Sequence, residues 1–281
     1  MTRTNHTSAM HVPDPQRRAI QARRTASVAA LKQSIFNRVM LAALVVVLWY
    51  LASRNVPAFV LPSPERVAAT WIRLVSLPSF WEDLTVTLSR VLAGFALAAV
   101  VGSVLGLIMG FDRRIGDFLE PVVIVINTVS SVIWAIFALI WFGLSEGTTI
   151  FVVFMTSMPL ILTNVWKGTQ QVDPGLVELA RTFRMSRSKI LLKIYLPTIM
   201  PEFFSGARLA FGFGARVVLI AETLGSTSGI GYRLRQAADL VQTDQVFAWT
   251  ITLVALMLTV EFAVLKPIEA RLFVWRRLAA P

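Results

Sequence analysis

Six long apolar segments divide this chain, and they constrain its fold more than any other feature of the sequence. Each has roughly the length that an α-helix needs to cross about 30 Å of hydrocarbon. The segments cover residues 35–53, 86–110, 118–142, 150–166, 205–224 and 246–265. One such segment could be a buried core helix, but six in succession with few internal charges indicate an all-α integral membrane protein with six transmembrane helices.

The composition agrees with lipid as the solvent. Hydrophobic residues make up 56% of the chain and charged residues only 15%, whereas soluble domains carry about 25% charged residues. The absence of cysteine excludes disulfides, zinc thiolate sites and cysteine nucleophiles. No segment has the short apolar core and cleavage site of a removed signal peptide, so the first apolar segment is expected to remain as an anchor.

The positive charge predicts the orientation in the membrane. If the N-terminus is cytoplasmic, twenty of the 27 lysine and arginine residues fall in cytoplasmic loops and tails, six fall outside, and Arg216 lies within the fifth helix. Cytoplasmic loops of membrane proteins carry such an excess. We therefore expect both termini in the cytoplasm. Topology and anionic lipid then explain the net charge of +11 without a nucleic-acid partner.

The chain divides into a tail, a membrane domain and a short end. Residues 1–34 are polar and basic, which predicts a disordered cytoplasmic tail. Residues 35–277 form the predicted transmembrane domain, followed by the end at 278–281. Between the first two spans, Val67, Trp71 and Leu74 have helical spacing and predict a short amphipathic helix at the outer surface.

The cytoplasmic loop 172–197 has the sequence of two short helices. Asp173 can cap a helix that starts at Pro174, and Ser186 can cap a second helix that Pro197 would end. On the first helix, one apolar stripe is made by Leu176, Leu179, Ala180 and Phe183. This stripe either packs on the chain's own bundle or the membrane interface, or docks on a partner.

The same loop resembles the EAA signature of ABC importer permeases. It reads Glu178-Leu179-Ala180, then Arg184, then Ile194-Tyr195-Leu196-Pro197. Leu179 and Arg184 depart from the family pattern, which has Ala and Gly there. Because that Gly permits a positive φ, an Arg in its place either costs about 1–2 kcal/mol or changes the turn. The resemblance implies contact with an ATPase for Glu178, Leu179, Ala180, Phe183, Arg184, Leu196 and Pro197.

Other motifs in fixed order are similar to the nitrate/sulfonate/taurine permease family. They are the stretches 88–95, 140–143, 221–222, 228–232 and 269–277. The resemblance implies the type I ABC importer permease fold, in which a permease homodimer sits on two ATP-binding subunits. It also implies a soluble substrate-binding protein, periplasmic or lipid-anchored. ATP and Mg²⁺ would bind to the partner ATPase, and this chain would bind no cofactor or metal.

Polar residues inside the apolar segments are the candidates for a substrate path. Asn127, Thr128, Ser130 and Ser131 lie near the middle of the segment 118–142, where the family usually carries prolines. Such residues either line a path or bond to neighbouring helices. Arg216 and Glu222 in the fifth segment each need a partner or a water-filled path. For Arg216, an ion pair and an anion-attracting role both fit, and for Glu222 a structural anchor is favoured.

Two other classes of function fit less well. An intramembrane hydrolase lacks its base, because the two histidines, His6 and His11, lie in the tail. A secondary transporter needs carboxylates near the midplane, and Glu222 is the one near-candidate. No Gly-Lys dipeptide exists to form a Walker A loop. The resemblance favours a small anionic cargo such as a sulfonate, taurine or nitrate, with a pyrimidine precursor or an aromatic acid as the alternative.

Overall fold

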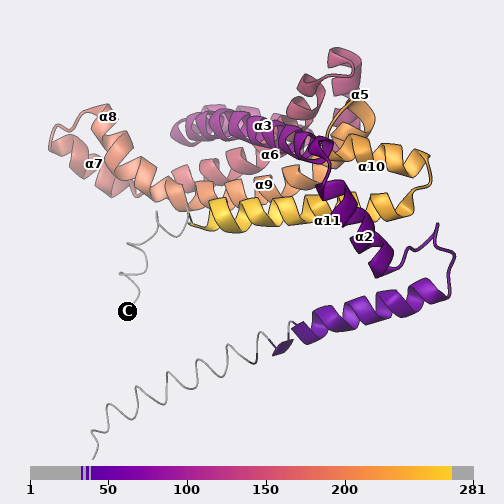
Figure 1. Ribbon diagram of the computed structural model, residues 1–281. Helices are drawn as coiled ribbons and strands as arrows, with labels where there is room; N and C mark the ends of the chain where they lie inside the picture. The colour runs from indigo at the N-terminus through magenta and orange to yellow at the C-terminus, as the bar shows by residue number, and fades with distance from the viewer. Residues whose placement is uncertain (1–32, 34–35, 38, 268–281) are drawn as a thin grey trace, which may run out of the picture. The chain divides into compact units, whose positions relative to one another are not determined.

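The computed structural model describes residues 33, 36, 37 and 39–267, and the regular elements in that range are helices (Figure 1). Apart from residue 33, the predicted tail 1–34 lies outside the described residues, as do the end 278–281 and the motif 269–277. Residues Met1–Pro64 and Glu65–Pro281 are two separate units. In the first unit, an apolar helix runs over Val39–Arg54, and the Trp49 indole donates a hydrogen bond to the Pro62 carbonyl oxygen at 3.1 Å.

Four helices of the second unit are long and apolar enough to cross a membrane. They are α3 (Pro78–Phe111), α6 (Glu146–Gln170), the continuous run Arg187–Gly225, and Thr243–Ala263, which contains α11 (Thr243–Val260). The first three contain the predicted segments 86–110, 150–166 and 205–224 in full, and 246–265 overlaps the fourth. The helices extend further than the segments, because polar residues towards their ends, such as Glu146 and Lys167 in α6, carry no hydropathy signal.

The segment 118–142, expected as one transmembrane helix, is broken into two helices. It forms α4 (Arg113–Thr128) and α5 (Ser131–Phe142), which are bent by 92° to each other. Val129 and Ser130 have extended backbone angles, and the Ser130 hydroxyl accepts a hydrogen bond from the Val132 N–H at 3.4 Å. Ser130 is therefore the N-cap of a new helix, a role that serine fills better than a helix interior.

The long run Arg187–Gly225 corrects the prediction that Pro197 ends a short helix. The run contains α8 (Arg187–Ile190), a π-helical turn (Leu191–Tyr195) and α9 (Leu196–Gly225) without interruption. Within the π turn, the Leu196 N–H donates to the Leu191 carbonyl oxygen, five residues back. Proline lacks an N–H and clashes with the carbonyl group four residues earlier. The wider turn directly before Pro197 lets the helix continue through it.

Helix α6 forms the centre of the bundle, between α3 and α9 (Figure 1). Its side chains Ile161, Leu162 and Val165 are fully buried. A stripe of glycines on α3 permits the close approach: a Cβ atom on Gly106 would lie 2.7 Å from the Leu162 carbonyl oxygen. Small residues are common where membrane helices touch, because dispersion contacts between backbones drive their association.

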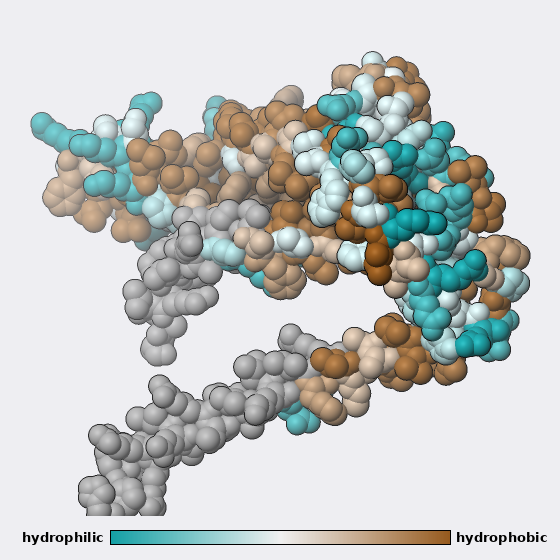
Figure 2. Space-filling model, in the orientation of Figure 1, coloured by the Kyte–Doolittle hydropathy of each residue, from teal (hydrophilic) through white to brown (hydrophobic). Residues whose placement is uncertain are grey.

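The surface of the bundle separates apolar and polar regions along its length. Figure 2 shows hydrophobic side chains over the middle of α3, α6 and α9, and hydrophilic side chains around α7 (Pro174–Thr182) and α8 at one end. A second hydrophilic region surrounds α10 (Ile230–Asp239) at the other end. This pattern is typical of a protein whose middle faces hydrocarbon.

The predicted amphipathic helix is present as α2 (Pro64–Val75). Val67 and Leu74 are buried, and the Trp71 indole donates to the Thr252 hydroxyl of α11 at 3.0 Å. The Thr70 hydroxyl donates to the Asp244 carboxylate of α11 at 2.6 Å. These bonds hold α2 on the polar end of α11.

Candidate functional site

The break between α4 and α5 opens onto a cavity of about 380 Å³. All four polar residues predicted for this stretch line it, together with side chains from α6 and α9. The lining includes Asn127, Thr128, Ser130, Ser131, Trp134, Thr156, Pro159 and Phe213. Because α5 starts a new helix here, the turn brings side chains from both sides of the break to one space.

The polar groups of this cavity fall into two kinds. The Thr128 hydroxyl bonds the Ile124 carbonyl oxygen at 2.7 Å, and the Thr156 hydroxyl bonds the Val152 carbonyl oxygen at 2.8 Å, so both satisfy their own helices. The side chains of Asn127 and Ser131 make no hydrogen bond to any described residue. Their donors are therefore available to a bound molecule.

Trp134 adds a third available donor, which the sequence did not point to. Its indole N–H is buried and has no hydrogen-bond partner in the described part of the chain. A buried indole N–H ordinarily finds an acceptor. The Trp134 ring contacts Phe137 and Phe151, each with ring centroids 6.2 Å apart. The one signal in the sequence is the position of Trp134 in the middle of an apolar segment, and this position does not indicate which group its N–H would bind.

Arg216 does not line this cavity. It is exposed on α9, and it makes no hydrogen bond or ion pair with the described residues. Phe213, which does line the cavity, lies one turn earlier on the same face of α9. Arg216 is thus beside the cavity, with its charge unpaired within the described range.

Glu222 lies elsewhere, in a buried polar cluster at the α10 end of the bundle. Its carboxylate is fully buried and accepts hydrogen bonds from Arg90 at 3.0 Å, from the Thr87 hydroxyl at 3.0 Å and from the Gly231 N–H at 2.8 Å. Arg90 is 3% exposed and also donates to Ser226 and Ser228. These bonds tie α3 to α9 and to the turn before α10.

A second ion pair strengthens the same cluster. The Asp83 carboxylate accepts a hydrogen bond from Arg233 at 2.6 Å and another from the Gly229 N–H at 2.8 Å. Gly229 has a φ of +102°, and a Cβ atom there would collide with the Glu222 carboxylate. Glycine is required at this position for both reasons. No local motif predicts the Arg90–Glu222 pair, because its two members lie 132 residues apart in the sequence.

Helix α7 presents three of the four predicted stripe residues to the surroundings. Leu176, Leu179 and Phe183 are 51%, 54% and 74% exposed, and Glu178 is exposed beside them. Ala180 is instead buried against Val172, Val177 and Ile190. The helix begins as predicted, with the Asp173 carboxylate accepting a hydrogen bond from the Gly175 N–H at 2.8 Å.

Arg184 takes the left-handed conformation that the family assigns to glycine, with a φ of +52°. The Met185 N–H donates to the Ala180 carbonyl oxygen at 3.0 Å, and the Arg184 N–H donates to the Arg181 carbonyl oxygen at 2.8 Å. This pair of bonds is the Schellman motif that ends many helices. The corner therefore keeps its turn despite the side chain. Leu196 and Pro197 lie in the first turn of α9.

Comparison with known proteins identifies the chain. The family model of binding-protein-dependent transport system inner membrane components matches residues 98–266. This chain belongs to that family.

Relatives with known names support the same assignment. A protein of Bacillus subtilis named as a putative aliphatic sulfonates transport permease protein is 29% identical over 240 residues, covering 84% of this chain and 86% of the relative. A putative ABC transporter permease protein of Methanocaldococcus jannaschii is 30% identical, covering 90% and 96%. The corresponding sulfonates permease of Escherichia coli is 31% identical, covering 83% and 88%. The chain is thus an ABC transporter permease and not an enzyme, and the ATPase is a separate chain.

A solved structure shares the fold. The permease chain is similar to a chain of the MetNI methionine ABC transporter in an inward-facing conformation, with a TM-score of 0.60 and 17% identity. The match covers 70% of this chain and 99% of that chain. The described helices of this chain therefore share the fold of that transporter chain.

Proposed function

We propose that this permease carries a small anion across the bacterial inner membrane through the space at the α4–α5 break. This proposal is based on three side chains, Asn127, Ser131 and Trp134, that line one cavity. Each has a hydrogen-bond donor without a partner among the described residues. Hydrogen-bond donors stabilise an anion that has lost its water. The unpaired charge of Arg216 beside the cavity would attract the same cargo.

The names of the relatives narrow the cargo to a class. The two relatives from Bacillus subtilis and Escherichia coli are named for aliphatic sulfonates, and others are named for taurine and nitrate. A sulfonate or nitrate presents acceptor oxygens, which suit three donors. An aromatic acid or a pyrimidine precursor is the second candidate, favoured by the Trp134 ring that lines the cavity and by the Phe137 and Phe151 rings that pack against it.

The assembly would be that of other importers in this family. A permease homodimer would sit on two ATP-binding subunits that hold ATP and Mg²⁺, and a soluble binding protein, periplasmic or lipid-anchored, would deliver the cargo. The exposed side chains of Leu176, Leu179 and Phe183 on α7 support docking on the ATPase, because a stripe of this kind needs a cover. The bent pair α4–α5 and the helix Val39–Arg54 would complete six spans, with both termini in the cytoplasm.

The path is tested by Asn127→Leu, which keeps similar volume and removes every hydrogen bond of the amide. We expect cargo uptake into proteoliposomes to fall at least tenfold, or about 1.4 kcal/mol if one step limits the rate. Thr128→Val is the matched control, because the Thr128 hydroxyl already bonds its own helix. Arg216→Leu should lower uptake of an anion more than it lowers ATP hydrolysis. Normal uptake by Asn127→Leu would move the path to other helices.

A further inference from the structure

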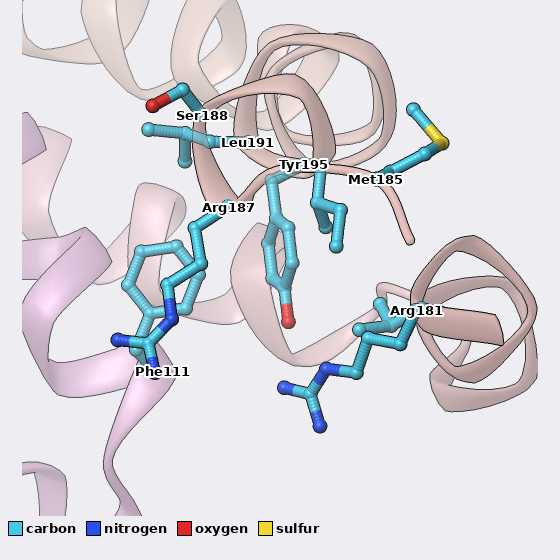
Figure 3. A pocket seen from close by; sticks show the side chains of 9 residues that line it. Phe111, Arg181, Met185, Arg187, Ser188, Leu191 and Tyr195 are labelled. Carbon is cyan, nitrogen blue, oxygen red and sulfur yellow. The ribbon is translucent and has the colours of Figure 1, made fainter. Parts of the chain in front are cut away.

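A second and larger cavity opens at the α7–α8 end of the bundle, the opposite end from α5 (Figure 1). It has a volume of about 990 Å³ and lies between the end of α3, α7 and the run from α8 into the π turn (Figure 3). Its polar lining consists of Arg181, Arg187, Ser188 and Tyr195, and Phe111 and Leu191 are among its apolar residues. Among the described residues, no carboxylate lines it.

Two arginines from different helices reach this cavity. In Figure 3 the Arg181 side chain extends from α7 and the Arg187 side chain from α8, with the Tyr195 hydroxyl between them in this view. Neither guanidinium group nor this hydroxyl has a hydrogen bond or an ion pair within the described residues. Two cations and a hydroxyl around a space without an acid form a site for an anion.

The cavity also connects to an apolar surface. Phe111 is 51% exposed, and Ile108 and Val104 on the same face of α3 are 41% and 50% exposed. Their spacing of three and four residues gives one stripe that leads from the cavity into the membrane-spanning part of α3. A free inorganic anion has no use for such a stripe, whereas an acyl chain packs along it.

The exposed stripe residues of α7 lie on a different side of that helix from the cavity. Val177 and Arg181 line the cavity, and Leu176, Leu179 and Phe183 are exposed outside it. At 100° per residue the two sets are separated by about 145° around the helix axis. A protein docked on the stripe therefore leaves the cavity open to the membrane.

We propose that this cavity binds the phosphate head group of an anionic phospholipid, with an acyl chain along the α3 stripe. Arg181 and Arg187 would pair with the phosphate, and Tyr195 would donate a hydrogen bond to it. Basic pockets between transmembrane helices on the cytoplasmic side bind such head groups. The proposal rests on the membrane orientation given under the proposed function. The lipid would tie α7 to the end of α3.

The test is lipid retention by the full-length permease. The chain is reconstituted into vesicles of phosphatidylcholine and phosphatidylglycerol, re-extracted, and its bound lipids are counted by native mass spectrometry. We expect the wild-type chain to retain phosphatidylglycerol above its share in the vesicle. In the double variant Arg181→Gln/Arg187→Gln, retention should fall at least about fivefold, since one basic group near a membrane contributes roughly that factor. Tyr195→Phe, which keeps the ring contact with Phe111, should give a smaller loss.

The matched control is Lys189→Gln/Lys193→Gln, which removes two charges from the same helical run but outside the cavity lining. This control should retain phosphatidylglycerol as the wild type does. Equal losses in both double variants would overturn the site, because they would reflect surface charge alone. Displacement of the lipid by millimolar inorganic phosphate would also overturn it in favour of a free anion. If the Arg181→Gln/Arg187→Gln variant retains phosphatidylglycerol as the wild type does but no longer assembles with the ATPase, the two arginines bind the protein partner and the lipid site is overturned. Lipid retention does not depend on cargo uptake, so this result is independent of the path proposed at the α4–α5 cavity.

Discussion

The buried pair Arg90–Glu222 should dominate the stability of the α10 end of the bundle. Glu222→Gln keeps the side-chain volume but replaces one carboxylate oxygen by an NH₂ group. The carboxylate accepts from Arg90, Thr87 and the Gly231 N–H, so the new NH₂ must face a donor. Removing one partner of a buried ion pair costs about 3–5 kcal/mol. We expect the lower end, because Arg90 keeps its bonds to Ser226 and Ser228.

Glu146→Gln is the matched control for this prediction. Its carboxylate also approaches Arg90, at 3.8 Å, but is 72% exposed, and an exposed pair contributes about 0–1 kcal/mol. Both variants would be unfolded reversibly in mixed micelles with a rising fraction of SDS, and their free energies of unfolding compared with the wild type. An equal loss of stability in the two variants would show that burial does not set the contribution of the Arg90–Glu222 pair.

Two further predictions concern the corner after α7 and the topology. Because Arg184 has a φ of +52°, Arg184→Gly should raise the free energy of unfolding by about 1 kcal/mol in the same micelle assay, and a loss of stability would contradict the strained turn. Since the chain has no cysteine, single cysteines at Arg187, Ser63 and Ser145 can report sidedness to an impermeant reagent: Ser63 and Ser145 should react from the periplasm, and labelling of position 187 from that side would reverse the proposed orientation.

Hydropathy could predict where the long helices lie, because hydrocarbon requires every backbone polar group to be bonded within its own segment. It could not predict the bend at Ser130. Both halves of the segment are apolar, and one serine can end a helix or sit within it. The same limit applies to Pro197, which commonly stops a helix but here follows a π turn. At both positions the helix can either end or continue, and the choice depends on packing against neighbouring helices, which the local sequence does not specify.

Some residues of the candidate site could be predicted from the sequence, and others depend on how the helices pack. Asn127 and Ser131 could be found from the sequence, because polar groups in the middle of an apolar segment stand out. Trp134 could not, since an indole looks apolar until its N–H is seen to lack a partner. Arg90 lies near the start of the predicted segment 86–110. Its contact with Glu222 depends on a packing of α3 against α9 that no spacing in the sequence encodes.

Coupling through α7 can be measured directly in a reconstituted importer that contains the permease, its ATPase and its binding protein. Leu179→Asp places a charge in the middle of the exposed stripe, where the side chain is 54% exposed and makes no contribution to the buried core. We expect this variant to fold and insert normally but to lose cargo uptake and binding-protein-stimulated ATP hydrolysis together. Stimulated hydrolysis at the wild-type rate would contradict the claim that α7 transmits the ATPase cycle to the permease.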